Sequence, residues 1–198
     1  QLGYRVGRLD MRLTAQRFDR LAGGTIDPYQ RLPQLDARYV GRLLGPFEWS
    51  LATQVGSFDR DNKNLTGIAR AVGERMHVEP RVRLPFYRPW GYLAFTGGVR
   101  YTRYDLQEID DPVIDESPDR NLGLASVAGG LYFDRDVEAF GIPLNHSLEP
   151  QLYYLYQGYQ NQDQLPQFDV TELTFGYNQL FRDNRFSGLD RIGDANQL

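Results

Sequence analysis

The sequence contains no cysteine, which excludes a disulfide framework and thiolate chemistry within these 198 residues. It also contains no window approaching the roughly 20 apolar residues that a membrane-spanning helix needs. A transmembrane β-strand needs only about 9–11 residues, half of which face away from lipid. The mean hydropathy of −0.53 therefore excludes a bundle of membrane helices but leaves a membrane β-barrel open.

Lysine is nearly absent as well, because Lys63 is the single lysine among 22 basic residues. The formal net charge of −4 argues against a general nucleic-acid binder, which carries a basic patch, and we expect no nucleic-acid partner. The excess of arginine suits rigid ion pairs and phosphate recognition, and an arginine preference of GC-rich coding explains it equally well.

Motifs of the common enzyme and cofactor classes are missing: there is no Gly-x-Gly pair, Walker, Gly-x-Ser-x-Gly or HExxH pattern. His77 and His146 fall on different predicted strands without a matched set of metal ligands, and we expect them to form hydrogen bonds. The acidic stretch 183–196 lacks the spacing of a calcium loop and is expected to be a packed or solvated loop. We therefore expect no enzymatic activity, no cofactor and no metal site.

The most regular pattern lies between residues 75 and 104. In residues 75–84 apolar and polar side chains alternate without interruption, and residues 92–104 resume the alternation after a turn predicted at 85–91. Successive side chains of a strand point to opposite faces. The pattern therefore predicts an antiparallel hairpin with one apolar face and one charged face.

Similar alternation predicts strands on both sides of this hairpin. Residues 135–145 are expected to form a connection, and residues 157–196 a long loop that contains a short strand or turn near 173–177. The chain is thus predicted to be all-β with about seven strands, at residues 4–18, 34–43, 48–58, 75–84, 92–104, 122–134 and 146–156.

The predicted connections alternate in length, with short ones at 44–47 and 85–91 and long ones at 20–33, 59–74 and 105–121. Outer-membrane barrels have short periplasmic turns, long extracellular loops and aromatic girdles, and aromatic residues gather near the predicted strand ends here. This favours a fragment of an antiparallel up-and-down transmembrane β-barrel. A soluble all-β domain has no reason to sort its loops by length.

Charged residues occupy the alternate positions that form the polar face of several predicted strands, and we expect this face to line the barrel lumen. Opposite charges on neighbouring strands would stabilise a polar wall, whereas unpaired arginines would line a path for phosphorylated or other anionic cargo. The candidate lumen-facing residues are Arg8, Arg12, Arg38, Arg42, Arg75, Glu79, Arg81, Arg83, Arg100 and Glu149.

The end of the chain carries the most specific motif. Residues 180–197 read LFRDNRFSGLDRIGDANQ, which closely resembles a block in the β-barrel of the LptD family, the lipopolysaccharide-assembly proteins of Gram-negative outer membranes. Shorter matches follow in the family's order at 29–33, 73–85 and 146–156. The resemblance covers essentially the whole chain.

This resemblance implies a fold, a location and partners. Family members form a very large antiparallel barrel in the outer membrane, plugged by an LptE-type lipoprotein and preceded by a jellyroll domain that receives lipopolysaccharide from a periplasmic bridge. Residues 1–198 would be an internal part of that barrel, in contact with outer-membrane lipid, and would supply wall, lumen lining and extracellular loops for lipopolysaccharide translocation. The jellyroll, the gate strands and the family's disulfide cysteines have no match in this sequence.

Two alternatives stay open. A general porin or receptor-type channel would share the alternation and the loop lengths, but it leaves the block at 180–197 unexplained. In a soluble all-β domain that binds or hydrolyses carbohydrate, the apolar faces of the strands would form the hydrophobic core. Carboxylate pairs such as Glu79 and Glu149 do not indicate a glycosidase, because the sequence defines neither their separation nor their pKa values.

Overall fold

The chain consists almost entirely of β-strands in the computed structural model, which describes residues 1–18, 28–174 and 176–198. Two short 3-10 helices, η1 (Gly67–Arg70) and η2 (Tyr177–Phe181), lie in connections. The prediction of an all-β chain is confirmed. The strands are β1 (Leu2–Val6), β2 (Leu9–Gln16), β3 (Gln30–Arg42), β4 (Glu48–Asp59), β5 (Val72–Arg88), β6 (Gly91–Gln107), β7 (Asp119–Leu131), β8 (Phe133–Ala139), β9 (Ile142–Leu148), β10 (Gln151–Gln157) and β11 (Ala195–Gln197).

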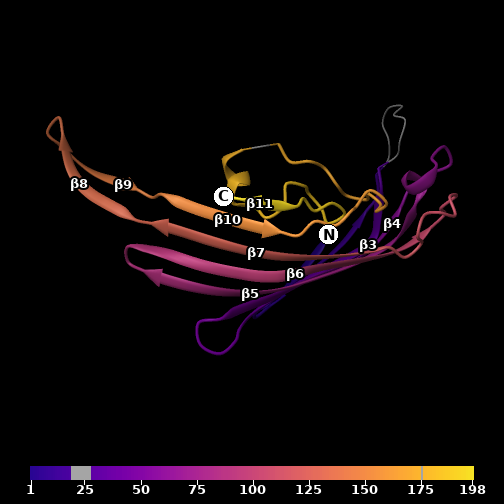
Figure 1. Ribbon diagram of the computed structural model, residues 1–198, viewed down its shortest axis with the longest axis horizontal. Coiled ribbons are helices and arrows are strands. Elements are labelled where there is room, and N and C mark those ends of the chain that lie inside the picture. The colour runs from indigo at the N-terminus through magenta and orange to yellow at the C-terminus, as the bar shows by residue number, and fades with distance from the viewer. Residues whose placement is uncertain (19–27, 175) are drawn as a thin grey trace.

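Nine strands form one antiparallel sheet in the order β1-β2-β3-β4-β5-β6-β7-β10-β11, and β8 and β9 form a separate hairpin (Figure 1). Neighbours in the sheet up to β7 are also neighbours in the chain, because antiparallel strands need only a turn between them. Within the described residues the outermost strands β1 and β11 are not paired with each other. The sheet is therefore open, and these strands do not form a closed barrel.

Up to β7, the connections alternate between short and long. Residues 7–8, 43–47 and 89–90 form short turns, whereas residues 60–71 and 108–118 form longer connections at the opposite end of the sheet (Figure 1). The predicted loop at 20–33 lies mostly outside the described residues, and β3 already begins at Gln30. The turn predicted at 85–91 is shorter than expected. Pro85 lies in β5 beyond the last residue that pairs with β4, and such an edge position tolerates proline.

The single strand predicted at 4–18 is wrong, because these residues form the β1–β2 hairpin. Val6 pairs with Leu9 across a two-residue turn, in which Gly7 has a φ of 55°. Glycine adopts this left-handed conformation without the steric cost that a side chain adds. The sequence carries a signal for this turn: the apolar residues of β1 have even numbers, whereas the apolar residues of β2 have odd numbers.

The connection predicted at 135–145 is also wrong. Residues 133–148 form the β8–β9 hairpin, in which Phe133 pairs with Leu148, and Figure 1 shows it extending beyond the main sheet. Its turn at Phe140 and Gly141 has positive φ values at both residues, as a type I′ hairpin turn requires. Polar residues such as Asp134 and Asp136 mask this hairpin in the sequence.

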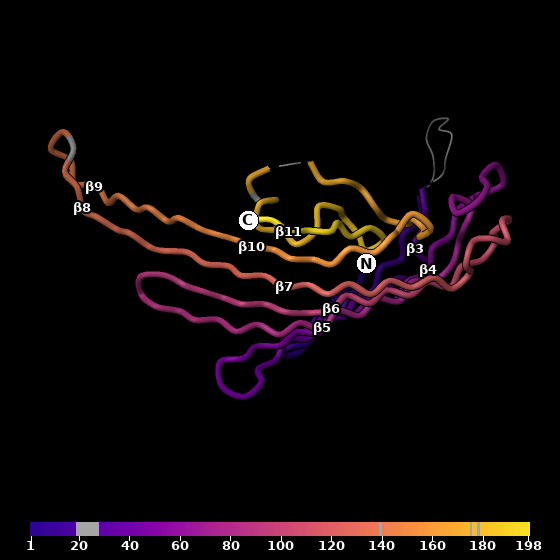
Figure 2. Tube along the Cα trace, in the orientation of Figure 1, coloured from indigo at the N-terminus to yellow at the C-terminus, as the bar shows by residue number. Residues whose placement is uncertain are grey.

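The predicted long loop at 157–196 contains more order than expected. β11 pairs with β10, and a bridge joins Glu172 to Phe186. Residues 158–174 and 176–198, called the C-terminal segment below, lie on the concave side of the curved sheet (Figures 1 and 2). The side of the sheet that faces this segment is called the inner face, and the opposite side the outer face.

The outer face carries apolar side chains in rows that cross the strands. One row runs through Leu13, Leu35, Val55 and Met76, which are register partners on β2 to β5. These side chains are between 39% and 50% exposed, although they lie in the middle of the sheet. The same holds for Val82 on β5 and for further apolar residues on β6, namely Leu93, Phe95 and Val99.

The inner face has the opposite character, because charged side chains are buried there. Arg75 and Arg120 have no exposed surface, and Arg100 is 4% exposed. A small apolar cluster adjoins them, in which the ring of Phe168 from the C-terminal segment stacks on Phe58 at 4.6 Å between centroids. In the part of the chain that the structure describes, no helix has the length and apolar character needed to cross a membrane.

Candidate functional site: a charged network on the inner face

The register of β4 to β7 places a row of polar side chains side by side on the inner face. Gln54 on β4 is opposite His77 on β5, which is opposite Thr102 on β6, which is opposite Arg120 on β7. Arg75 lies two residues before His77 on the same face and is opposite Tyr104. Alternation along each strand thus turns four separate sequence segments into one polar surface.

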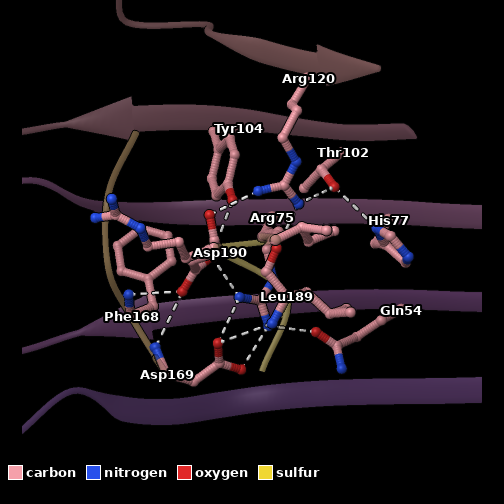
Figure 3. A network of polar contacts seen from close by, with 12 residues as sticks. Gln54, Arg75, His77, Thr102, Tyr104, Arg120, Phe168, Asp169, Leu189 and Asp190 are labelled. Carbon is pink, nitrogen blue, oxygen red and sulfur yellow. Dashed lines mark hydrogen bonds and ion pairs between the residues drawn. The ribbon is translucent and has the colours of Figure 1, made fainter. Parts of the chain in front are cut away.

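Arg75 is the centre of this surface, and two carboxylates of the C-terminal segment neutralise it (Figure 3). Its Nη1 and Nη2 donate to the two carboxylate oxygens of Asp169 over 2.9 and 2.7 Å, a bidentate pair. Nη1 also donates to Asp190, and Nη2 to Gln54. Bidentate, charge-assisted hydrogen bonds of this kind are among the strongest in proteins.

Asp190 receives donors from several directions, all drawn in Figure 3. Besides Arg75, it accepts hydrogen bonds from the Tyr104 hydroxyl at 3.0 Å and from the backbone N–H of Phe168 at 2.7 Å. Burial raises the pKa of the Asp190 carboxyl. Burial also opposes ionisation of Asp169, but the hydrogen bonds and charge of Arg75 outweigh it and lower the pKa of Asp169 to about 2.

Arg120 fixes the backbone of the same segment. Its Nη1 donates to the carbonyl oxygen of Asp190 at 2.6 Å and to Gln162 Oε1 at 2.8 Å, and its Nη2 donates to Thr102 Oγ1 at 3.0 Å. Thr102 Oγ1 lies 2.9 Å from His77 Nδ1, in hydrogen-bonding range. A single arginine thereby joins a strand of the sheet to the loop that carries Asp190.

A second cluster lies farther along β5 and β6. Glu79 accepts hydrogen bonds from Arg81 and from Arg100, the latter at 2.9 Å. Both arginines also form ion pairs with Asp183 of the C-terminal segment, and that of Arg100 measures 2.9 Å. Two arginines and two carboxylates give no net charge, which reduces the cost of burying them.

The block at 180–197 folds around its own polar side chains. The Asn184 amide nitrogen donates to the carbonyl oxygen of Arg191 at 3.1 Å, and its oxygen accepts from the backbone N–H of Gly193 at 3.2 Å. Gly188 has a φ of 67°, and a Cβ at this position would lie 2.2 Å from Asp169 Oδ1. A side chain at residue 188 would therefore displace the carboxylate that holds Arg75.

The sequence-predicted charged residues separate into three groups. Arg75, Glu79, Arg81 and Arg100 belong to the network, and Arg83 forms its own ion pair with Glu48 at 3.0 Å. The remaining ones lie outside the network among the described residues: Arg8, Arg12 and Arg38 line a cleft over β1 to β5, Arg42 ends β3, and Glu149 lies exposed between β9 and β10.

Sequence reasoning missed the partners of the buried arginines. Asp169, Asp183 and Asp190 lie in a region predicted to be a loop. Arg120 lies in the predicted loop at 105–121 and was therefore not placed on a polar strand face. The pairs span up to 115 residues of sequence, so no local pattern reveals them. The block at 180–197 was the available signal, because it contains both Asp183 and Asp190.

The network is a set of ion pairs between the sheet and the C-terminal segment, and it is called the latch below. Its arginines and carboxylates pair with one another, and no group of three or more His, Asp or Glu side chains in the described ranges is arranged to hold a metal ion. Leaving any of these buried charges without a partner would cost several kcal/mol. The network therefore holds the C-terminal segment against the sheet.

Sheet and network together define a class: an antiparallel β-sheet protein that buries its charges on a concave inner face and exposes apolar side chains on its outer face. The chain belongs to the LptD family, whose model, described as LPS transport system D, matches residues 1–198. The family resemblance inferred from the sequence is confirmed.

Curated relatives agree with the family model. The LPS-assembly protein LptD of Pseudomonas aeruginosa strain UCBPP-PA14 is 40% identical over 226 residues, covering all of this chain and 24% of the relative. LptD of Alkalilimnicola ehrlichii is 40% identical over 92% of this chain and 24% of the relative. LptD of Marinobacter nauticus is 42% identical over 86% of this chain and 21% of the relative. The chain thus spans about a quarter of the length of these relatives.

Proposed function

We propose that this chain forms part of the wall of an outer-membrane β-barrel that translocates lipopolysaccharide to the outer leaflet. Its family and the names of its relatives support lipopolysaccharide as the cargo. The rest of such a barrel, and a jellyroll domain that receives lipopolysaccharide from a periplasmic bridge, would come from the remainder of a longer protein. Transport of this kind requires no covalent chemistry.

The observation that carries the proposal is the reversed distribution of polarity. Apolar side chains in the middle of the sheet, such as Val82 and Val99, are more than 40% exposed, whereas Arg75 and Arg120 are fully buried. A soluble sandwich would bury the apolar face and solvate the charged one. A membrane barrel does the opposite, with an apolar band toward lipid and a polar interior.

The lengths of the elements fit the same assignment. β5 and β6 each have 17 residues, which exceeds the roughly 9–11 that a tilted transmembrane strand requires. The short turns would face the periplasm and the longer connections the exterior. The C-terminal segment would lie inside the lumen, next to the space that an LptE-type plug would occupy.

The proposal is tested by placing a charge on each face of the full-length protein. Val82→Arg on β5 puts arginine on the outer face, where a charge near the bilayer midplane costs about 2–4 kcal/mol. The matched control is Ser50→Arg on β4, which is the register partner of Arg81 and lies on the inner face. We expect Val82→Arg to lower the amount of assembled outer-membrane protein and of surface lipopolysaccharide, and Ser50→Arg to leave both near wild type.

Equal assembly of the two variants would contradict the lipid-facing assignment and restore the soluble all-β alternative. Loss of assembly in Val82→Arg without any fall in surface lipopolysaccharide would instead favour a general channel in the outer membrane. The block at 180–197 is the feature that a general channel does not explain.

A further inference from the structure

A cleft of about 890 Å³ opens on the inner face over β1 to β5, beside the buried network, with which it shares Gln54, His77 and Glu79. Arg5, Arg8, Arg12 and Arg38 line it, and the backbone at Gly188 and Leu189 of the C-terminal segment forms one edge. This volume falls within the range of roughly 300–1,000 Å³ that ligand sites occupy. The hairpin turn between β1 and β2 brings Arg5 and Arg8 to the cleft, because it folds β1 back along β2.

Among the residues that the structure describes, three of these arginines form no ion pair. Arg5 donates to Asp10 at 2.8 Å, but Arg8, Arg12 and Arg38 form no side-chain hydrogen bond or ion pair within the described ranges. All three are exposed to the cleft rather than packed. They differ in this respect from Arg75 and Arg100, which form ion pairs with carboxylates of the network.

The acidic residues at the cleft are already engaged. Asp36 accepts hydrogen bonds from Gln34, at 3.0 Å, and from Gln54. Glu79 is shared between Arg81 and Arg100. Arg12 and Arg38 lie on neighbouring strands, two register positions apart, so their guanidinium groups bear on the same part of the cleft. The cleft lining thus contains four arginines against three carboxylates, those of Asp10, Asp36 and Glu79, in a protein whose net charge is −4.

A buried donor or acceptor at the floor of the cleft is also free. His77 is 2% exposed and lines the cleft, and its Nε2 forms no hydrogen bond of normal geometry. Its nearest charged neighbour, Glu79 Oε2, is 3.5 Å away, which is too long for a good hydrogen bond. Buried polar atoms usually have a partner, and a ligand in the cleft would supply one.

From these contacts we infer that the cleft binds a phosphate-bearing saccharide. Guanidinium groups pair with phosphate oxygens through two parallel hydrogen bonds, and arginine is favoured over lysine for this role. The cleft lining also contains Gln34 Oε1, a buried acceptor without a hydrogen-bond partner among the described residues, and the Asp36 carboxylate, and both can accept hydrogen bonds from sugar hydroxyls. The inference rests on the proposed function, since it assigns the phosphorylated sugar part of lipopolysaccharide to a definite site.

The test is a binding measurement on the full-length protein in detergent. The probe is a fluorescently labelled, fully deacylated lipopolysaccharide core oligosaccharide, used with its phosphates and after enzymatic dephosphorylation. The variant is Arg12→Gln with Arg38→Gln, and the matched control is Arg42→Gln, an exposed arginine of β3 outside the cleft. Because none of the three is paired, the variants keep the contacts that hold the fold, and unchanged thermal unfolding checks this.

We expect the double variant to weaken binding of the phosphorylated probe about tenfold, through lost charge-assisted hydrogen bonds, and the control to change it little. Dephosphorylation of the probe should weaken wild-type binding to a similar extent. Equal binding of the two probes, or equal effects of the double variant and of Arg42→Gln, would overturn the inference. Displacement of the probe by an equimolar amount of inorganic phosphate would overturn the saccharide assignment.

Failure of this inference is distinguishable from failure of the proposed function. Binding is measured on purified protein, whereas the proposed function is measured by surface lipopolysaccharide in cells. A protein that delivers lipopolysaccharide but binds the probe equally well without Arg12 and Arg38 would refute the cleft alone.

Discussion

Arg75 keeps its charge in a fully buried position because four acceptor atoms from three side chains surround its guanidinium. Two carboxylates from the C-terminal segment provide most of that stabilisation, and Asp190 in turn accepts hydrogen bonds from Tyr104 and from backbone N–H groups. Since every partner is itself held by another, the loss of one side chain is felt by the whole cluster. At the scale of residues, then, the inner face depends on pairing over long sequence distances.

Asp190→Asn should destabilise the full-length protein by about 3 kcal/mol. Breaking a buried ion pair typically costs about 3–5 kcal/mol, and Asp169 would keep Arg75 partly neutralised. Thermal unfolding in detergent measures the loss, and limited proteolysis should cut the C-terminal segment more readily. The matched control is Asp194→Asn, an exposed residue of the same segment. If both variants unfold at the wild-type temperature, the latch does not hold this segment.

At the scale of elements, the sheet depends on strands that approach closely at a few positions. Gly73 near the start of β5 has a φ of 149°, a conformation that residues with a side chain rarely adopt. A Cβ there would lie 2.1 Å from the carbonyl oxygen of Asp105 on β6. The β5–β6 hairpin can therefore close at this end only with glycine at residue 73.

Gly73→Ala should disrupt the end of the β5–β6 hairpin and reduce assembly of the full-length protein severalfold. The clash is with backbone, so no side-chain rotation relieves it. Gly97→Ala on β6 is the matched control, because a Cβ at residue 97 meets no atom within 4 Å. The amount of heat-modifiable protein in outer-membrane fractions provides the measurement. Assembly of Gly73→Ala at the level of Gly97→Ala would show that this close approach is not required.

The sequence predicted the elements whose pattern is local. β5 and β6 followed from uninterrupted alternation, and the same alternation places Arg75, Glu79, Arg81 and Arg100 on one polar face. The β1–β2 turn was missed because the prediction followed only the odd-numbered apolar positions of residues 9–15. Before Gly7 the apolar positions are even-numbered, and this change marks the turn. The β8–β9 hairpin was missed because polar residues such as Asp134 and Asp136 interrupt its apolar pattern, although Phe133 and Val137 pair with Leu148 and Leu144 on one face.

The strand residues of the candidate site were predictable from the sequence, but their partners in the C-terminal segment were not. Parity identifies the strand residues of a polar face, but it does not tell which loop covers them. The pairs of Arg75 with Asp169 and Asp190 join residues about 94 and 115 positions apart, and only tertiary packing brings them together. The cleft of unpaired arginines depends in addition on the fold of β1, which the alternation pattern misassigned.

At the scale of the whole molecule, the sheet has an apolar outer face, an ion-paired inner face and two unpaired edges. An open sheet with exposed edges at β1 and β11 leaves backbone groups unpaired, and exposed edges promote association with other strands. Further strands on both sides would satisfy these groups, as a barrel does. We expect the isolated residues 1–198 to aggregate in water, and monomeric solubility in size-exclusion chromatography would contradict this expectation.

The central claim is that the outer face of the sheet contacts lipid and the inner face does not. Spin labels attached to single cysteines along β6 test it most directly, and this chain contributes no cysteine of its own to interfere. In the full-length protein in bilayers, labels at residues 93, 95, 97 and 99 should be accessible to lipid-soluble oxygen, and labels at 92, 94, 96 and 98 should not. An alternation of period two in oxygen accessibility would support the account. Uniform accessibility, or contact of the outer positions with a water-soluble relaxation agent, would contradict it.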